Sequence, residues 1–179
     1  KAGAFALLAE LGRRGAAPPW AVLASSTSSL LGYAGQANYC AANALLDHAA
    51  AFAHLADDGE PAVAPPGGCR PQLLTLNFGP WGEVGMAREG TKAHALSLAS
   101  GEVPMASADA IRCIARALRQ LARADDGAGR PARALQFCVA DVEWWRSPWP
   151  AHPLLQRVMR RLPPPPVDSP ADAPAASSA

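Results

Sequence analysis

The chain has 179 residues and a formal charge of +1, from 16 Lys and Arg against 15 Asp and Glu. This is the length of one ordinary domain, and a charge so close to zero gives no electrostatic reason to bind nucleic acid or an anionic membrane surface. Half of the residues are hydrophobic but only 6% are aromatic, so we expect a core of small side chains.

The first half of the sequence alternates between helical and strand patterns. A helix from Lys1 to about Arg14 is expected first, followed by a short apolar strand over Trp20–Ala24. A segment rich in Ser, Thr and Gly covers residues 25–34, and a long helix is expected over Gly35–Leu55.

The second half continues the alternation. Gln72–Phe78 is expected to be a strand, residues 79–90 a loop, and Ser107 the N-cap of a helix that runs to about residue 124. Ala134–Val139 is the last expected strand. Strands separated by helices predict an α/β fold with a doubly wound parallel sheet and helices on both faces.

The remaining segments are read from their composition. Residues 61–71 hold four prolines and two adjacent glycines, so we expect a surface excursion. Residues 163–179 consist almost entirely of Pro, Ala, Ser and Asp, which predicts a disordered linker after a domain over residues 1–150 and a connecting helix or linker over residues 151–162. The chain begins inside a helical pattern, so we expect a preceding segment. We find no signal peptide and no candidate membrane span, and expect a cytoplasmic protein.

The cysteines and histidines do not predict a metal site. Cys40, Cys69, Cys113 and Cys138 lie 29, 44 and 25 residues apart, which matches neither paired metal ligands nor a small disulfide framework. The four histidines form no recognised metal-binding motif. We therefore expect reduced thiols and no bound metal.

Polar side chains with suitable chemistry follow the first expected strand. Ser26 stands at its end, Tyr39 follows 13 residues later, and Asn43 lies one helical turn beyond Tyr39. The ligand site of such sheets lies beyond the carboxyl ends of the strands, so the three side chains are expected to converge there. A Ser and a Tyr that donate to one carbonyl oxygen are what reduction of a ketone by hydride requires.

A tyrosine needs help to act as a proton donor at neutral pH. The reference pKa of its phenol is about 10, and a neighbouring cation lowers it. Lys1 is the only lysine in this region.

Three motifs together identify a known family. Residues 25–51 read SSTSSLLGYAGQANYCAANALLDHAAA, residues 77–87 read NFGPWGEVGMA, and residues 139–144 read VADVEW. In this order and spacing they resemble the ketoreductase domains of modular polyketide synthases, which belong to the short-chain dehydrogenase/reductase superfamily. The resemblance covers roughly residues 1–150 and implies the carboxyl-terminal part of a Rossmann-like fold.

The resemblance implies roles for matching residues. Tyr39 would be the proton donor, Ser26 the hydroxyl that orients the carbonyl, and Asn43 the residue that arranges the water and lysine network. Lys1 is one residue further from Ser26 than the family's lysine usually is, so the lysine is either Lys1 or a residue upstream of it. The implied cofactor-binding and substrate or lid residues are, respectively, Asn77, Gly79, Pro80 and Trp81, and Gln36, Gly85 and Met86.

The implied reaction is reduction of a β-ketoacyl thioester by NADPH. The substrate would be carried on phosphopantetheine by an acyl carrier protein domain of a polyketide or closely related fatty acid synthase. No G-x-G-x-x-G follows a strand here, so the nucleotide-phosphate site would lie in an upstream half of the ketoreductase and this chain alone would be inactive. Two alternatives are a structural, non-reducing domain and a free-standing reductase of small ketones.

Two departures from the family concern the stereochemistry of the product. Leu31 stands where some members have a Trp, eight residues before the Tyr, and Ala41 stands where some have a Pro. Both departures favour the B-type hydroxyl configuration without epimerisation.

Overall fold

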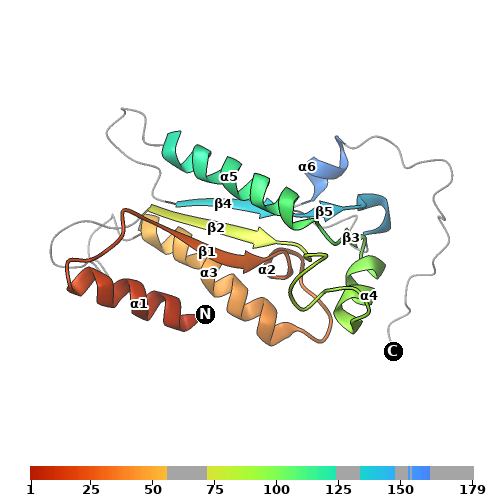
Figure 1. Ribbon diagram of the computed structural model, residues 1–179, viewed down its shortest axis with the longest axis horizontal. Coiled ribbons are helices and arrows are strands. Elements are labelled where there is room, and N and C mark those ends of the chain that lie inside the picture. The colour runs from red at the N-terminus through yellow and green to blue at the C-terminus, as the bar shows by residue number, and fades with distance from the viewer. Residues whose placement is uncertain (56–71, 124–133, 148–152, 154, 162–179) are drawn as a thin grey trace.

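The computed structural model describes residues 1–55, 72–123, 134–147, 153 and 155–161. Helices and strands alternate along most of this chain (Figure 1). In order they are α1 (Ala2–Arg13), β1 (Trp20–Ser26), α2 (Ser28–Leu31), α3 (Ala37–Leu55), β2 (Gln72–Phe78), α4 (Lys92–Ala99), β3 (Glu102–Val103), α5 (Ser107–Arg123), β4 (Ala134–Val139), β5 (Asp141–Val142), a 3-10 turn (Trp144–Arg146) and α6 (Gln156–Met159).

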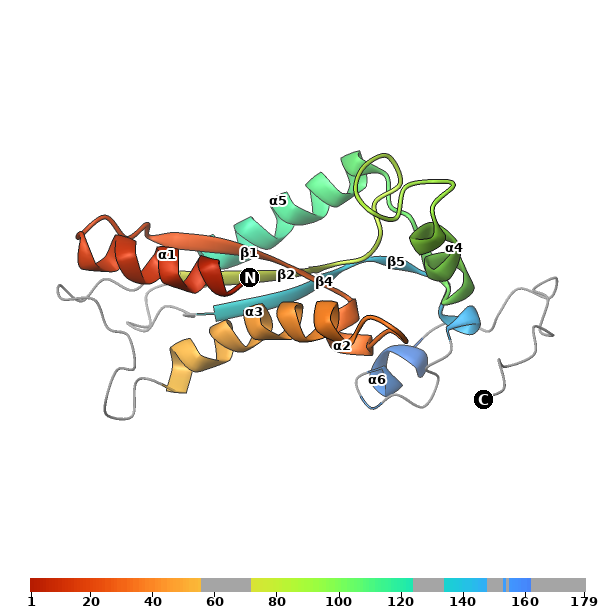
Figure 2. The same ribbon diagram turned by 90° about the horizontal axis from the view of Figure 1, so that it is seen from below.

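The main sheet is parallel and has the strand order β1-β2-β4. Ser26 pairs with Phe78 and Phe78 pairs with Val139, so the three strands end at one edge of the sheet. Helix α5 covers one face and α3 the other (Figure 2). The predicted parallel α/β sheet with helices on both faces is confirmed.

The core lies between β2 and α5. Leu74 and Leu76 of β2 are fully buried, against a stripe of small and apolar residues on α5. That stripe recurs at helical spacing as Ala110, Ala117 and Leu121. Alanine at the contact allows the helix to approach the sheet closely, as expected for a composition poor in aromatic residues.

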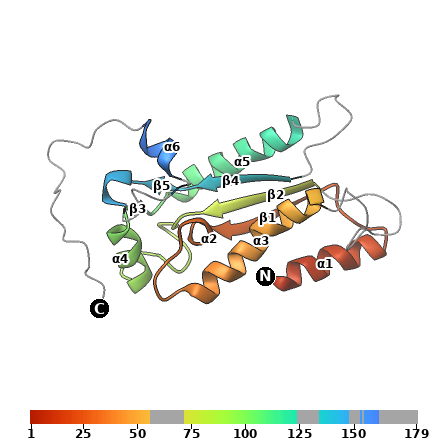
Figure 3. The same ribbon diagram turned by 180° about the vertical axis from the view of Figure 1, so that it is seen from behind.

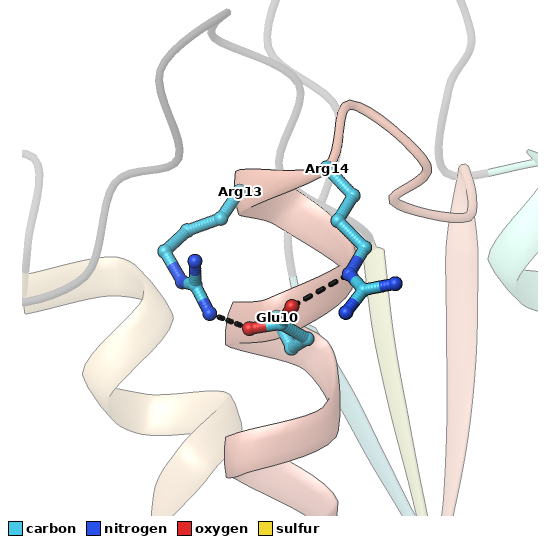
Figure 4. A network of polar contacts seen from close by, with 3 residues as sticks. All are labelled: Glu10, Arg13 and Arg14. Atoms are coloured by element: carbon cyan, nitrogen blue, oxygen red, sulfur yellow. Dashed lines mark hydrogen bonds and ion pairs between the residues drawn. The ribbon is translucent and has the colours of Figure 1, made fainter.

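Among the described strands, β1 lies at the edge of the main sheet. β1 is an edge strand that leaves Trp20 and Val22 exposed, and α1 lies on this side of the molecule with Leu7 exposed (Figure 3). At the carboxyl end of α1, the carboxylate of Glu10 bridges Arg13 and Arg14 (Figure 4). These charges are largely solvated, so the bridge contributes little to stability.

Several boundaries differ from the predicted ones for local reasons. Helix α3 begins at Ala37, because Gly35 has a φ of +76° that a right-handed helix does not allow. Ser107 is the first residue of α5, not its N-cap, and its hydroxyl donates to Glu83. The strand β1 extends two residues further than predicted, to Ser26.

The short elements α2, α4, β3 and β5 were not predicted. Strands of two residues and a helix of four carry too little periodicity to be recognised, and α4 has no strong apolar face. The predicted surface excursion and the Pro-rich linker lie outside the described residues. In the part of the chain that is described, no helix is both long and apolar enough to cross a bilayer.

Candidate functional site

A cavity of about 500 Å³ lies beyond the carboxyl ends of β1 and β2. Its walls come from the end of β1 and the turn after it, the start of α3, the loop after β2, and α4 with β3. The lining residues are Ser25, Ser26, Thr27, Ser28, Tyr33, Gln36, Tyr39, Phe78, Gly79, Pro80, Trp81, Val84, Gly85, Met86, Ala87, Ala93, Leu96, Ser97 and Glu102. Eight of the predicted site residues line this cavity, namely Ser26, Gln36, Tyr39, Gly79, Pro80, Trp81, Gly85 and Met86.

Ser26 donates its hydroxyl proton to no acceptor among the described residues. The side chain is 9% exposed, and its Oγ accepts a hydrogen bond from the backbone N–H of Ser28 at 3.2 Å. A hydroxyl that accepts through a lone pair still has one proton to donate. The turn into α2 therefore holds the Ser26 oxygen in place and leaves its proton for an acceptor in the cavity.

Tyr39 lines the cavity, whereas Asn43 lies behind it. Asn43 is fully buried, and its Nδ2 donates to the backbone oxygen of Tyr39 at 2.9 Å. The Asn43 Oδ1 accepts no hydrogen bond from the described residues. The expected convergence of three side chains is thus seen for Ser26 and Tyr39, with Asn43 contacting the backbone of the helix turn that carries Tyr39.

Lys1 reaches β1 but does not line the cavity. Its Nζ donates to the backbone oxygen of Ala24 at 2.9 Å, two residues before Ser26, in an exposed position. The lysine side chain therefore lies beside the strand that ends at the cavity, with its ammonium directed to a backbone carbonyl.

Asn77 is buried in a polar network on the α3 side of β2. Its Nδ2 contacts both carboxylate oxygens of Asp47 at 3.0 Å and the hydroxyl of Ser29 at 2.9 Å. Its Oδ1 accepts from Gln136 Nε2 at 2.9 Å. This amide is fully buried, does not line the cavity, and holds the polar network together.

A second polar cluster was not predicted from the sequence. The carboxylate of Glu102 on β3 is 2% exposed and accepts a hydrogen bond from Thr27 Oγ1 at 2.7 Å. Its other oxygen accepts from the hydroxyl of Tyr33. Burial and the neighbouring Glu102 carboxylate raise the pKa of Tyr33 far above its usual range, so its hydroxyl stays protonated. All three residues line the cavity.

The loop between β2 and α4 closes one side of the cavity and is anchored at its base. Gly82 N–H donates to Met105 O, and Met105 N–H donates to Pro80 O, each at 2.9 Å. The rings of Phe78 and Trp81 meet edge to face with centroids 5.5 Å apart. Further along, Glu83 accepts from Ser107 and Met86 O accepts from Thr91 Oγ1 at 3.1 Å, while Met86 remains 71% exposed. The loop thus has a fixed base and an exposed tip.

Metal chemistry finds no support in the described ranges. No group of three or more His, Cys, Asp or Glu residues there is placed to hold a metal ion. Cys40, Cys113 and Cys138, the cysteines described, are free thiols. The fourth, Cys69, lies outside the described residues.

The fold and the cavity together define an α/β protein with a cavity at the carboxyl edge of a parallel sheet. Comparison with known proteins shows which family it resembles. Residues 2–66 match the KR domain. Polyketide synthases GfsB and GfsA of Streptomyces halstedii are 42% and 41% identical to this chain over 125 residues, or 70% of its length. The chain spans about 2% and 1% of the length of these two relatives.

A solved structure supports the same assignment. "The Structure of a C2-type Ketoreductase from a Modular Polyketide Synthase" is 26% identical, with a TM-score of 0.52 over 79% of this chain and 24% of that one. The chain is therefore similar to the ketoreductase domains of modular polyketide synthases, and its parallel α/β sheet is of the Rossmann-like type that they have. The resemblance predicted from the sequence is confirmed.

Proposed function

We propose that this chain is the carboxyl-terminal part of a ketoreductase domain that reduces a carrier-bound β-ketoacyl thioester with NADPH. The observation that carries the proposal is that Ser26 and Tyr39, from β1 and α3, line one cavity. Together they provide two hydroxyl donors for one carbonyl oxygen at the edge of the sheet where such folds bind ligands.

The residues that line the cavity support the proposed cofactor and substrate. Gly79, Pro80 and Trp81 line the cavity together with Ser26 and Tyr39, and would hold the nicotinamide. NADPH, when bound, supplies the hydride that reduces the β-carbon. The residues that would hold its phosphates belong, in our proposal, to an upstream half of the domain, because no glycine-rich phosphate loop occurs in this sequence.

The chain's own residues would act on the carbonyl oxygen. Ser26 donates a hydrogen bond to that oxygen and orients it, and its own oxygen is held by Ser28 N–H. As negative charge develops on the oxygen, Tyr39 gives it a proton, so a carbon–hydrogen bond and an oxygen–hydrogen bond replace the carbonyl π bond. Asn43, whose buried oxygen has no donor among the described residues, is suited to bind a donor of the relay that returns the proton to Tyr39.

The substrate is proposed to arrive on the phosphopantetheine of an acyl carrier protein domain of the same synthase. In this scheme residues 1–150 form the ketoreductase part, residues 151–162 a connecting segment and residues 163–179 a linker. Gln36, Gly85 and Met86 would contact the acyl chain or close over it. We further propose the B-type hydroxyl configuration, which chiral analysis of the reduced thioester tests; the opposite hydroxyl would refute it.

An isotope experiment tests the reduction itself. The complete domain, with this chain and its upstream half, is given acetoacetyl thioester and NADPH deuterated at the transferable position. We expect one deuterium at the β-carbon of the product. Ser26→Ala should lower kcat about 100-fold or more, whereas Cys113→Ser, on the exposed side of α5, should not change it. Absence of deuterated product would refute the proposal.

One observation favours a second candidate, a structural domain that does not reduce. Lys1 donates to a backbone oxygen and does not line the cavity, so the cation that a catalytic tyrosine needs is not placed beside Tyr39 by the described residues. The two candidates differ in one result. A structural domain that binds NADPH would give no deuterated product, even with every residue of the complete domain present.

A further inference from the structure

The cavity contains a charged group that the proposed reaction does not use. Glu102 is 2% exposed, and no Lys or Arg among the described residues forms an ion pair with it. Its carboxylate is instead held by two hydroxyl groups, from Thr27 and Tyr33. A buried carboxylate is costly unless hydrogen bonds compensate for its lost hydration. The three side chains therefore depend on one another.

These contacts join three separate parts of the cavity wall. Thr27 follows Ser26 at the end of β1, and its backbone N–H donates to Phe78 O at 3.0 Å. Tyr33 stands in the turn between α2 and α3, and Glu102 in β3 lies next to Gly101, whose N–H donates to Leu98 O at 3.1 Å. Glu102 thus connects the strand end that holds Ser26 to the turn before Tyr39.

The raised pKa of Tyr33 keeps its hydroxyl protonated as a donor to Glu102. Burial and the adjacent carboxylate both disfavour the phenolate of Tyr33, so the hydroxyl remains a donor. The phenol ring cannot turn away without leaving the carboxylate partly unpaired. Tyr33 is consequently a fixed boundary of the cavity, unlike Met86 in the exposed loop tip.

The place of Tyr33 in the cavity wall indicates which part of the substrate it would contact. Ser26 and Tyr39 mark the reacting carbonyl in the proposed reaction, and Gly79 to Trp81 the cofactor side. The remaining lining includes Gln36 and the loop residues Val84 to Ala87, and a further part formed by Tyr33 and Glu102 with Ala93, Leu96 and Ser97 of α4. We propose that Tyr33, held by Glu102, is a specificity-determining residue that limits the length of the acyl chain beyond the β-carbon; this inference rests on the proposed function.

Chain-length selectivity tests the proposal. For the complete domain, kcat/KM is measured with acetoacetyl and β-ketodecanoyl thioesters. Tyr33→Ala removes the ring and should shift the ratio toward the longer substrate by roughly 10-fold or more, since one methylene in a pocket changes specificity by about that factor. An unchanged ratio in a folded Tyr33→Ala protein would overturn the proposal.

Two conservative variants test whether Glu102 holds the ring. Tyr33→Phe removes only the hydroxyl, and Glu102→Gln removes the charge and replaces one acceptor oxygen by an NH2 donor, so Thr27 and Tyr33 no longer both find an acceptor. Each should shift the same ratio in the same direction, and the double variant should shift it no further than the larger single effect, because both changes break one interaction. Shifts that add, or that are absent in both variants, would contradict the positioning role. If Tyr33→Ala does not fold, these two conservative variants still test the proposal.

Binding separates this inference from the proposed function. The affinities of the same two thioesters, measured by calorimetry without NADPH, do not require turnover. If wild-type protein binds them but forms no product, the reductase proposal fails while the chain-length test continues on affinities. The inference then stands if the ratio of the affinities for the longer and the shorter thioester is higher for Tyr33→Ala than for wild type. It is refuted if this ratio is unchanged.

Discussion

Thr27 donates a hydrogen bond of 2.7 Å to the buried carboxylate of Glu102, although 75 residues separate the two in sequence. The bond attaches the end of β1 to the short strand β3, which otherwise pairs only with β5 among the described strands. It thereby connects the residue after Ser26 to the α4 side of the cavity. The shape of the site depends on this contact as well as on the parallel sheet.

Gly101 is expected to be intolerant of any side chain. Its φ is +79°, and a Cβ there would lie 2.7 Å from the backbone oxygen of Glu143. Gly101→Ala should lower the free energy of unfolding by more than the roughly 1 kcal/mol that left-handed strain costs. Gly90→Ala is the matched control, because its φ is +81° and open space surrounds it. Equal losses for the two variants in urea unfolding would contradict this expectation.

Asn77 is expected to stabilise the fold. Asn77→Leu keeps the branched shape of the side chain but removes the buried amide donor shared by Asp47 and Ser29, so the Asp47 carboxylate keeps the Ser29 hydroxyl and loses the amide. We expect the free energy of unfolding to fall by about 2–4 kcal/mol. Gln136→Ala removes one bond to the same amide from an exposed position and should cost below about 1 kcal/mol. Denaturant unfolding would refute this if Asn77→Leu were as stable as wild type.

The contact between Glu83 and Ser107 predicts a pH dependence of stability. The Ser107 hydroxyl and backbone N–H both donate to Glu83 Oε2 and hold the pKa of that carboxyl below its usual value. The stabilisation is therefore fully present above the unfolded pKa of about 4.3, and is lost as the pH falls through the lower, folded value.

The pH dependence is measured by comparing the melting temperatures of wild type and Glu83→Gln. The difference in melting temperature between wild type and Glu83→Gln should be largest near neutral pH and should shrink below the unfolded pKa. Glu89→Gln, an exposed glutamate of the same loop, serves as the control. A difference that grows on acidification would show that the linkage has the opposite sign.

The sequence predicted the location of the site because the carboxyl ends of parallel strands meet at one edge. Ser26 and Tyr39 both line the cavity there, as their spacing suggested. Asn77 differs because it lies inside β2, not in the loop after it. Successive side chains of a strand point to opposite faces, so Thr75 and Asn77 lie on the face opposite Phe78. The Asn77 amide therefore lies on the α3 side, where it donates a hydrogen bond to the Asp47 carboxylate.

The Glu102 cluster could not be predicted from local patterns. Within Gly-Glu-Val-Pro a glutamate is typical of an exposed loop, and β3 has only two residues. Its burial depends on Thr27 and Tyr33, which come from elements distant in sequence. One signal was present: the polar Thr27 directly follows Ser26 at the end of an apolar strand. Its partner, however, is fixed only by tertiary packing.

Tyr39→Phe tests the central claim most directly. The measurement is the rate of NADPH oxidation with acetoacetyl thioester by the complete domain, together with NADPH affinity. Removal of the single hydroxyl should lower kcat by about 100-fold or more, with NADPH affinity unchanged. Tyr33→Phe removes the other tyrosine hydroxyl of the same cavity and should retain most of this turnover. Wild-type turnover in Tyr39→Phe would contradict the assignment of Tyr39 as the proton donor.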